Sequence, residues 1–330
     1  MEANCRKARL LFLLIACAGL TLAPVLAPGA RAADDGALSL GVGATGGQRV
    51  HTDVMQALKI DKKYGLDIAY SYFPGPRGMQ ALLTGRVQVA NLGAIVAARM
   101  TNEGRHMQNF EVFFDSHISF MVPPESPIKD FWELRGKRLG IIPRASAFYT
   151  TFAILMAQKG LDVEKEFDLI IGNPAALQTF LERRDVAGIM HFEPFSTALT
   201  VKGEAKEIAT YEDLWRQITG RSLLFVTAGA SKEWLDANPK TARKLAQAIA
   251  ETRRVMRENP DTIKHGLEAL GPYGKDARVV AALKERMMKR IYRSDWDDAA
   301  IAAGRWQVEQ AYKLKQLDKL PDKDLFVKFQ

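Results

Sequence analysis

The chain has 330 residues, of which 47% are hydrophobic and 25% are charged, and its formal net charge is +8. This composition is that of a folded globular protein, and it excludes disordered, collagen-like and polytopic membrane proteins. At about 150 residues per domain, the length predicts two domains, each large enough to bury its own core.

The N-terminal segment, residues 1–32, has the pattern of a secretory signal peptide. Basic side chains between residues 6 and 9 precede an apolar run over residues 10–22, and Ala30 and Ala32 supply the small residues of a cleavage site. We therefore expect an exported protein that is cleaved after Ala32. Because the preceding residues also match a lipoprotein box, a lipid anchor at Cys17 is the alternative.

Cleavage after Ala32 would remove four basic side chains and one acidic one, which lowers the formal charge from +8 to +5. A charge of that size helps an anion to approach, but it does not indicate a nucleic-acid partner. Both cysteines, Cys5 and Cys17, lie in the removed segment. The mature chain would therefore contain no disulfide, no thiolate nucleophile and no cysteine-bound metal.

Short apolar strands alternate with amphipathic helices in the first part of the mature chain. This β-α-β-α-β-α order predicts a parallel sheet that is flanked by helices. The predicted strands are at residues 38–42, 66–73 and 87–91, the helices at 50–58, 79–84 and 95–102, and two further strands at 112–115 and 118–122.

Three prolines between residues 123 and 127 interrupt this pattern, and a second βα series begins after them. Its predicted strands are at residues 138–142, 167–171 and 187–190, its helices at 147–159, 175–182 and 195–201, and a returning strand at 222–227. The remainder, from residue 232 to residue 312, is predicted to be helical.

These patterns predict an α/β fold with two lobes that are joined by two crossings, near residues 119–124 and 223–228. Lobe 1 would comprise residues 33–122 and 229–330, and lobe 2 residues 123–228. In open α/β sheets, ligands bind beyond the carboxyl ends of the strands. Two facing lobes can bring those ends to one cleft, and a hinge can close it.

The first lobe offers candidate residues at the carboxyl ends of its strands. Gly41, Gly43 and Gly46 match G-x-G-x-x-G, but a dinucleotide site would need an acidic residue at the end of the second strand, which is Phe73 here. We expect instead that the free N–H groups of this turn line a small-molecule cleft. The candidate ligand-binding residues of the lobe are Thr45, Gly46, Gln48, Pro74, Arg77, Gly93 and Ala94.

The second lobe offers Arg144, Ser146 and Phe148 after one strand, and His191 and Glu193 after another. Arg144 can hold an oxyanion through two parallel hydrogen bonds, and Ser146 can cap the helix that follows it. We therefore expect Arg144→Ala to weaken ligand binding at least ~10-fold with little effect on folding. Phe148 and the aromatic residues near it would equally suit a flat heteroaromatic ligand.

Several of these segments, in this order, resemble the substrate-binding proteins of ABC transporters for nitrate, sulfonates, taurine and thiamine pyrimidines. Residues 72–75 and 81–85 and Gly93 resemble the first-lobe pattern, and residues 134–140 and Glu193-Pro194 the second. The resemblance implies a type II periplasmic-binding-protein fold that closes on a small organic or inorganic solute and delivers it to an ABC permease. We accordingly expect a periplasmic monomer that is not an enzyme and uses no metal, cofactor or nucleic acid.

Two other functions remain open from the sequence. An exported enzyme could bind a metal through His51, His117 and His191, since three histidines can form a metal site. A sensory protein could bind the same solute and report to a membrane receptor. The sequence contains no nucleophile-elbow, zincin or P-loop motif. We expect the basic helix face at residues 284–290 to be solvated.

Overall fold

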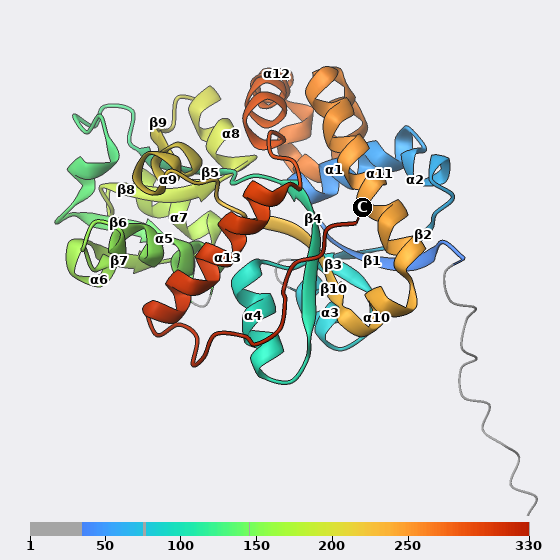
Figure 1. Ribbon diagram of the computed structural model, residues 1–330. Helices are drawn as coiled ribbons and strands as arrows, with labels where there is room; N and C mark the ends of the chain where they lie inside the picture. Colours follow the sequence, from blue (N-terminus) through green and yellow to red (C-terminus); the bar gives the residue numbers. More distant parts are fainter. Residues whose placement is uncertain (1–34, 75–76, 145, 330) are drawn as a thin grey trace, which may run out of the picture. The chain divides into compact units, whose positions relative to one another are not determined.

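The computed structural model describes residues 35–74, 77–144 and 146–329 (Figure 1). The predicted signal peptide, its cleavage site and the alternative anchor at Cys17 lie outside the described residues. Within the described part of the chain, no helix combines the length and the apolar character that a membrane span requires.

The first lobe is built on a five-stranded sheet with the order β2-β1-β3-β10-β4. Its strands are β1 (Ala37–Gly43), β2 (Asp67–Phe73), β3 (Val89–Asn91), β4 (Met107–Phe114) and β10 (Val226–Ser231). β1 pairs in parallel with β2 and β3, whereas β10 is antiparallel to β3 and β4. The returning chain therefore completes a sheet that the N-terminal segment began.

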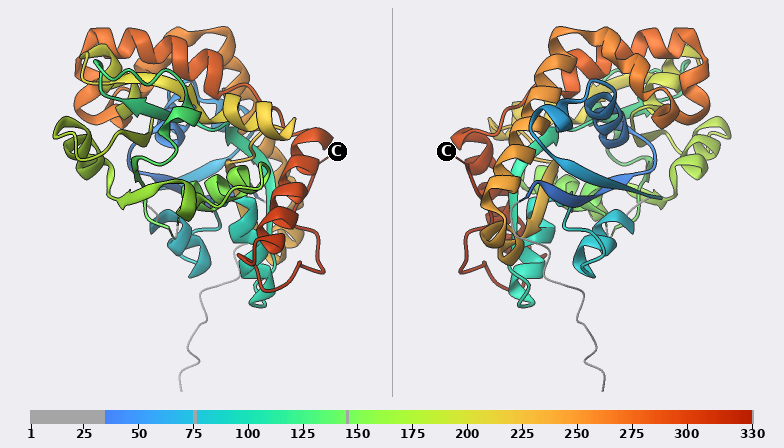
Figure 2. Two further views of the ribbon diagram at one scale, coloured as in Figure 1. Left: turned by 90° about the vertical axis from the view of Figure 1, so that its left-hand side faces the viewer. Right: turned by 90° about the vertical axis from the view of Figure 1, so that its right-hand side faces the viewer.

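Helices lie on both sides of this sheet (Figure 2). The apolar residues Val50 and Val54 of α1 are fully buried, as their four-residue spacing predicts. A second apolar cluster under α3 and α4 covers the other side of the sheet and includes Leu82 and Ala97. The helices of this part are α1 (Gly47–Ala57), α2 (Ile60–Lys63), α3 (Arg77–Leu83), α4 (Ala94–Asn102), α10 (Lys232–Ala237) and α11 (Pro239–Glu258).

The second lobe is built on a sheet with the order β7-β6-β8-β5-β9. Its strands are β5 (Ile118–Val122), β6 (Arg138–Ile141), β7 (Asp168–Ile171), β8 (Gly188–Phe192) and β9 (Lys206–Thr210). β6 pairs in parallel with β7 and β8, and β5 is antiparallel to β8 and β9. The two sheets thus repeat one topology, which confirms the predicted two-lobe α/β fold.

The helices of the second lobe begin at residues that satisfy their first N–H groups. The side chains of Ser146, Asn173 and Thr210 each accept a hydrogen bond from a backbone N–H three residues later. These helices therefore start directly after the carboxyl ends of strands. The lobe contains the short helix η1 (Phe131–Leu134) and the helices α5 (Ala147–Ala157), α6 (Val163–Glu166), α7 (Pro174–Glu182), α8 (Phe195–Val201) and α9 (Tyr211–Thr219).

The second lobe differs from the sequence prediction in two respects. β5 pairs with β8 and β9, so this strand, which we predicted in lobe 1, belongs to the second sheet and the first crossing is residues 115–117. β9 and α9 were not predicted at all. All residues of β9 are only half-buried and its sequence begins with Lys206-Glu207, so this strand at the edge of the sheet lacks a continuous apolar pattern.

The C-terminal part contacts both lobes. Helix α13 packs against α4 of the first lobe and α5 of the second. Gln158, directly after α5, donates a hydrogen bond to Gln310 of α13 over 3.1 Å, and the rings of Trp215 and Trp306 are 5.8 Å apart. The elements here are η2 (Pro260–Gly266), η3 (Glu268–Lys275), α12 (Ala277–Arg286), the π-helical turn η4 (Met287–Ile291) and α13 (Asp298–Lys313).

Candidate functional site

Aromatic side chains from the second lobe and from the two crossings meet in one cluster. The ring of His117, in the first crossing, lies 5.6 Å from the ring of Phe192 and 6.1 Å from that of Phe225, which precedes β10. Phe148 of α5 lies 5.1 Å from Phe225 and 5.5 Å from Phe192. We call these four residues the cleft cluster. Such edge-to-face rings form an apolar surface that suits a flat or apolar ligand group.

The cleft cluster continues into the first lobe. The ring of His117 also lies 5.2 Å from Phe114 at the end of β4. Nearby, Phe195 at the start of α8 lies 5.6 Å from Tyr273 in η3. Burial lowers the pKa of His117 to about 4, so its imidazole is neutral at physiological pH. The lobes therefore meet here through uncharged rings.

The glycine-rich turn after β1 is held by the protein itself. The N–H of Gly46 donates to the carbonyl of Ala269 over 2.9 Å, and the buried Gln48 side chain accepts a hydrogen bond from Gly43 over 3.1 Å. Gly46 has a φ of 87°, which favours glycine. Thr45 is exposed beside it. Gln48 therefore supports the turn, and two of the N–H groups that we predicted to be free already have partners.

The other predicted residues of the first lobe lie at two places. Pro74 and Arg77 are exposed on either side of the two residues that the structure does not describe, 75 and 76. Gly93 and Ala94 begin α4 and line a small cavity together with Thr150 of α5 and Phe225. The structure thus brings the start of α4 next to the second lobe and to the cleft cluster.

Arg144 is engaged by a neighbour in its own lobe. Its Nε and Nη2 atoms donate to the two carboxylate oxygens of Glu164, each over 2.7 Å, and the hydroxyl of Tyr149 donates to the same carboxylate. This pairing lowers the pKa of Glu164 to about 2. The guanidinium that we expected to be free for an oxyanion is thus paired in this structure, although about half of the side chain is exposed. Ser146 caps α5 as predicted.

His191 and the other histidines do not form a metal centre in the described residues. The Nε2 atom of His191 lies 3.2 Å from the carbonyl oxygen of Pro174, and its Nδ1 accepts from the N–H of Phe192 over 2.9 Å. Burial lowers its pKa to about 4. His51 lies in the core of the first lobe against Phe113. In the part of the chain that the structure describes, no three histidine, cysteine or acidic side chains could hold a metal together.

Glu193 takes part in an ion pair that links the second lobe to the C-terminal part of the chain. Its Oε1 accepts from Nε of Arg286 over 2.9 Å, and its Oε2 accepts from the N–H of Thr197 over 3.1 Å. Arg286, at the end of α12, also pairs with Glu207 of β9. We call Arg286, Glu193 and Glu207 the Arg286 clasp.

The clasp corrects the prediction that the basic helix face at residues 284–290 is solvated, because only 17% of the Arg286 side chain is exposed. Nothing in the sequence pairs this arginine with Glu193, which lies 93 residues earlier in the chain. A basic residue on an amphipathic helix has the same local pattern whether it faces water or another lobe. The sequence therefore contains no pattern from which the pairing of Arg286 with Glu193 could be predicted.

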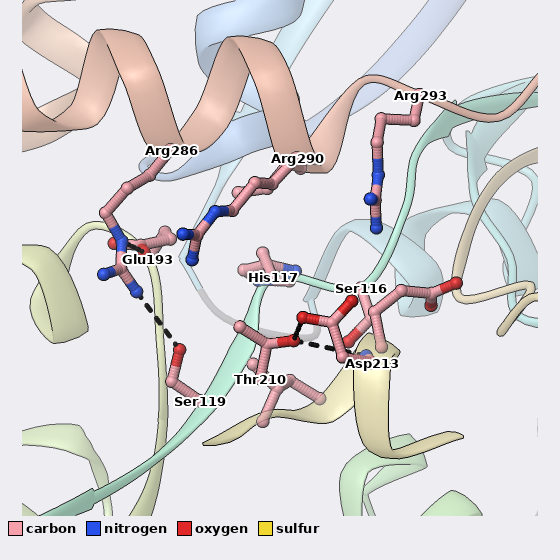
Figure 3. A pocket seen from close by; sticks show the side chains of 12 residues that line it. Ser116, His117, Ser119, Glu193, Thr210, Asp213, Arg286, Arg290 and Arg293 are labelled. Atoms are coloured by element: carbon pink, nitrogen blue, oxygen red, sulfur yellow. Dashed lines mark hydrogen bonds and ion pairs between the residues drawn. The ribbon is translucent and has the colours of Figure 1, made fainter. Parts of the chain in front are cut away.

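A polar pocket lies beside the clasp, at the first crossing (Figure 3). Its volume is about 150 Å³. We call it the hinge pocket. It is lined by Ser116, His117, Ile118, Ser119, Glu193, Thr210, Glu212, Asp213, Arg286, Arg290, Ile291 and Arg293. Of the residues that we predicted to bind a ligand, only Glu193 lines this pocket, so its arginines were missed.

Two α/β lobes with repeated topology, joined by two crossings, are the architecture of the periplasmic-binding proteins. The structure is similar to the aliphatic sulphonate binding protein SsuA of Escherichia coli, with a TM-score of 0.69 and 17% identity over 87% of this chain and 95% of that one. It is also similar to the alkanesulfonate-binding protein SsuA of Xanthomonas axonopodis pv. citri, with a TM-score of 0.68 and 17% identity over 90% and 100% of the chains. The nitrate-binding protein NrtA of Synechocystis PCC 6803 has a TM-score of 0.63 and 14% identity over 87% and 84%.

The chain belongs to the NMT1-like family, which matches residues 31–270. This match spans both lobes and confirms the group that the sequence motifs resemble. No curated protein sequence matches the chain. At identities below 20%, the similar structures establish the fold alone.

Proposed function

We propose that the protein is an exported receptor that binds a small solute between its lobes and delivers it to an ABC permease. The cleft cluster is the observation that supports this proposal most directly. Its four rings come from the second lobe and from both crossings, so a ligand bound against them would contact the parts of the molecule that move when the lobes close. The NMT1-like family and the three similar binding proteins agree with it.

The proposed ligand is a small anion or a flat heteroaromatic solute. Phe148 and Phe192 belong to the ring cluster, and the start of α4 at Gly93 and Ala94 lines a small cavity with Phe225 of the same cluster. N–H groups at a helix start favour an anionic group. Similar proteins that bind aliphatic sulphonates and nitrate make an anion the first candidate.

The remaining predicted residues have less direct parts in this proposal. Arg144 would have to exchange Glu164 for the ligand, while His191 and Glu193 would act by holding the second lobe in shape. We further propose a periplasmic monomer without enzymatic activity, cleaved after Ala32, with lobes divided at the two crossings, near residues 116 and 225.

A ligand screen tests the proposal. Purified protein is heated with nitrate, sulfonates, carboxylates, pyrimidines and flavins, and a true ligand at 100 times its Kd stabilises the fold by about 2.7 kcal/mol. X-ray scattering of the same samples should show a smaller radius of gyration in the bound state. Stabilisation by no compound of these classes, or stabilisation without compaction, would contradict the receptor proposal.

The variant Phe148→Ala should weaken binding of the identified ligand at least ~10-fold, which corresponds to 1.4 kcal/mol. Phe180→Ala is the matched control, because Phe180 is half-buried like Phe148 but packs in the α7 region away from the cleft cluster. Equal affinities of the two variants would remove the cleft cluster from the site.

A further inference from the structure

The hinge pocket contains charged groups that the Arg286 clasp does not use. The guanidinium of Arg293 makes no hydrogen bond or ion pair with any described residue, and Arg290 reaches only the Oε1 of Glu207, at 3.4 Å. Figure 3 shows both guanidinium groups directed from the end of the helical segment toward the pocket. Arg293 gives one wall of the pocket a positive charge that neither Glu193 nor Glu207 pairs with, and Arg290, which shares Glu207 with Arg286, adds to it.

The backbone that carries Arg293 is fixed in place. The carboxylate of Asp115, in the first crossing, accepts hydrogen bonds from the N–H groups of Arg293 and Ser294, each over 2.9 Å. The N–H of Asp115 donates to Ile291 over 2.7 Å. Tyr292 is fully buried and donates its hydroxyl to the carbonyl of Gly47 over 2.9 Å. Arg293 is therefore presented from a rigid segment, which lowers the entropic cost of binding through it.

The floor of the pocket has unsatisfied polar atoms. Ser116 is more than nine-tenths buried and lines the pocket, yet its hydroxyl has no hydrogen-bond partner among the described residues. The Nδ1 atom of His117 has none either. A buried polar atom without a partner costs about 1–3 kcal/mol. A ligand that accepts a hydrogen bond from Ser116 would remove that cost.

The opposite wall is negative. Asp213 lies in the first turn of α9, where the hydroxyl of Thr210 donates to its Oδ2 over 2.5 Å, and it forms no ion pair with any described residue. Its neighbour Glu212 is buried and is paired with Arg216 over 2.7 Å. The pocket thus has one positive wall from the C-terminal segment and one negative wall from the second lobe.

We propose that the hinge pocket is a second binding site, separate from the cleft cluster, for a small zwitterion. Its oxyanion binds Arg293, Arg290 and the hydroxyl of Ser116, and its ammonium group binds Asp213. The volume of about 150 Å³ admits a ligand of only a few heavy atoms. His117 forms the boundary with the cleft cluster, because it lines the pocket and contacts Phe148 and Phe192.

The site acts as an effector site of the hinge. Arg293 belongs to the segment that is fixed to the first crossing and to Gly47 of the first lobe, whereas Asp213 belongs to the second lobe. A zwitterion that bridges the two side chains binds only when the lobes have this arrangement. By linkage, it stabilises the arrangement whether or not the cleft holds its own solute.

Calorimetric titration with ω-amino acids tests the proposal. Glycine, β-alanine and γ-aminobutyrate vary the distance between the two charges, and propionate and propylamine carry one charge each. We expect at least one of the three zwitterions to bind ~10-fold or more tightly than both single-charge compounds. No binding of any of them, or equal binding of zwitterion and propionate, would overturn the proposal.

Variants locate the binding. Arg293→Gln and Asp213→Asn, both at exposed positions, should each weaken binding of the preferred zwitterion at least ~10-fold, whereas Arg243→Gln, an exposed arginine on α11 outside the pocket, should not. Phe148→Ala should leave this affinity unchanged. Loss of binding in Phe148→Ala with retention in Arg293→Gln would place the zwitterion in the cleft and overturn the second site, while leaving the receptor proposal intact.

Discussion

The cleft cluster and the Arg286 clasp both hold the second lobe against other parts of the molecule, but by different physical means. In the cleft cluster, four uncharged rings lie 5.1 to 6.3 Å apart, so the contact is apolar and only loosely directional. In the clasp, one guanidinium reaches Glu193 and Glu207 of the second lobe at the same time. An apolar contact of the first kind can slide, whereas an ion pair is either made or broken.

The two regions differ in what it costs to rearrange them. Rings that touch without specific bonds can change their mutual packing without leaving a charge unpaired. A charged group that is mostly buried cannot lose its partners without a large cost in free energy. In the proposed receptor, the clasp would set the arrangement of the lobes and the cleft cluster would provide the variable surface.

Removing the Arg286 clasp should have the largest effect on the stability of the fold. Arg286→Ala leaves Glu193, whose side chain is only 4% exposed, without its counter-ion. We expect the free energy of unfolding to fall by about 3 kcal/mol, since breaking a buried ion pair from one side is strongly destabilising. Urea denaturation measures it. Arg278→Ala, at an exposed ion pair with Asp276, is the control and should leave the midpoint unchanged. Equal midpoints for both variants would show that the clasp does not hold the lobes.

Acid should affect the cleft cluster through His117. Its pKa is about 4 in the folded protein because of burial, against 6.5 for the unfolded chain, so the unfolded state takes up a proton first as the pH falls. The contribution of neutral His117 to the free energy of unfolding is therefore complete above pH 6.5. It is lost toward pH 4, at up to about 1.4 kcal/mol per pH unit.

His117→Phe should therefore make the free energy of unfolding depend less steeply on pH between 6.5 and 4. The decrease in slope corresponds to at most one bound proton. Burial also lowers the pKa values of His51 and His191, so these two residues still contribute to the pH dependence of unfolding in the variant. His265→Phe, at an exposed position, is the control. An unchanged slope in His117→Phe would mean that the cleft cluster admits water freely.

Arg144 should show the smallest effect on stability. Its ion pair with Glu164 is about half exposed, so Arg144→Ala should change the free energy of unfolding by at most about 1 kcal/mol. The ~10-fold loss of ligand affinity expected from the sequence requires that the guanidinium leave Glu164. In that case Glu164→Gln should tighten binding of an anionic ligand in calorimetric titration. Unchanged affinity in both variants would exclude Arg144 from the site and leave the cleft cluster as the recognition surface.

Local patterns were sufficient where a segment is buried on a defined face. The strands at 38–42 and 66–73 and the helix at 50–58 were predicted close to their observed positions, because recurring apolar residues in a short strand and a four-residue helical spacing are properties of the segment itself. β9 was missed for the converse reason, since an edge strand that begins with Lys206-Glu207 has no such pattern. Ser146 was correctly predicted to cap α5, which also depends only on local sequence.

By itself, the sequence determined the alternation of strands and helices, the two-lobe α/β fold and the family to which the chain belongs. All of these depend on patterns within short segments and on their order along the chain. Only the tertiary structure decided which side chains meet at the crossings. Arg144 pairs with Glu164 rather than remaining free, and Arg286 meets Glu193 across 93 residues of sequence. Such pairs depend on the path of the chain through both lobes, and the charge of a single residue carries no information about that path.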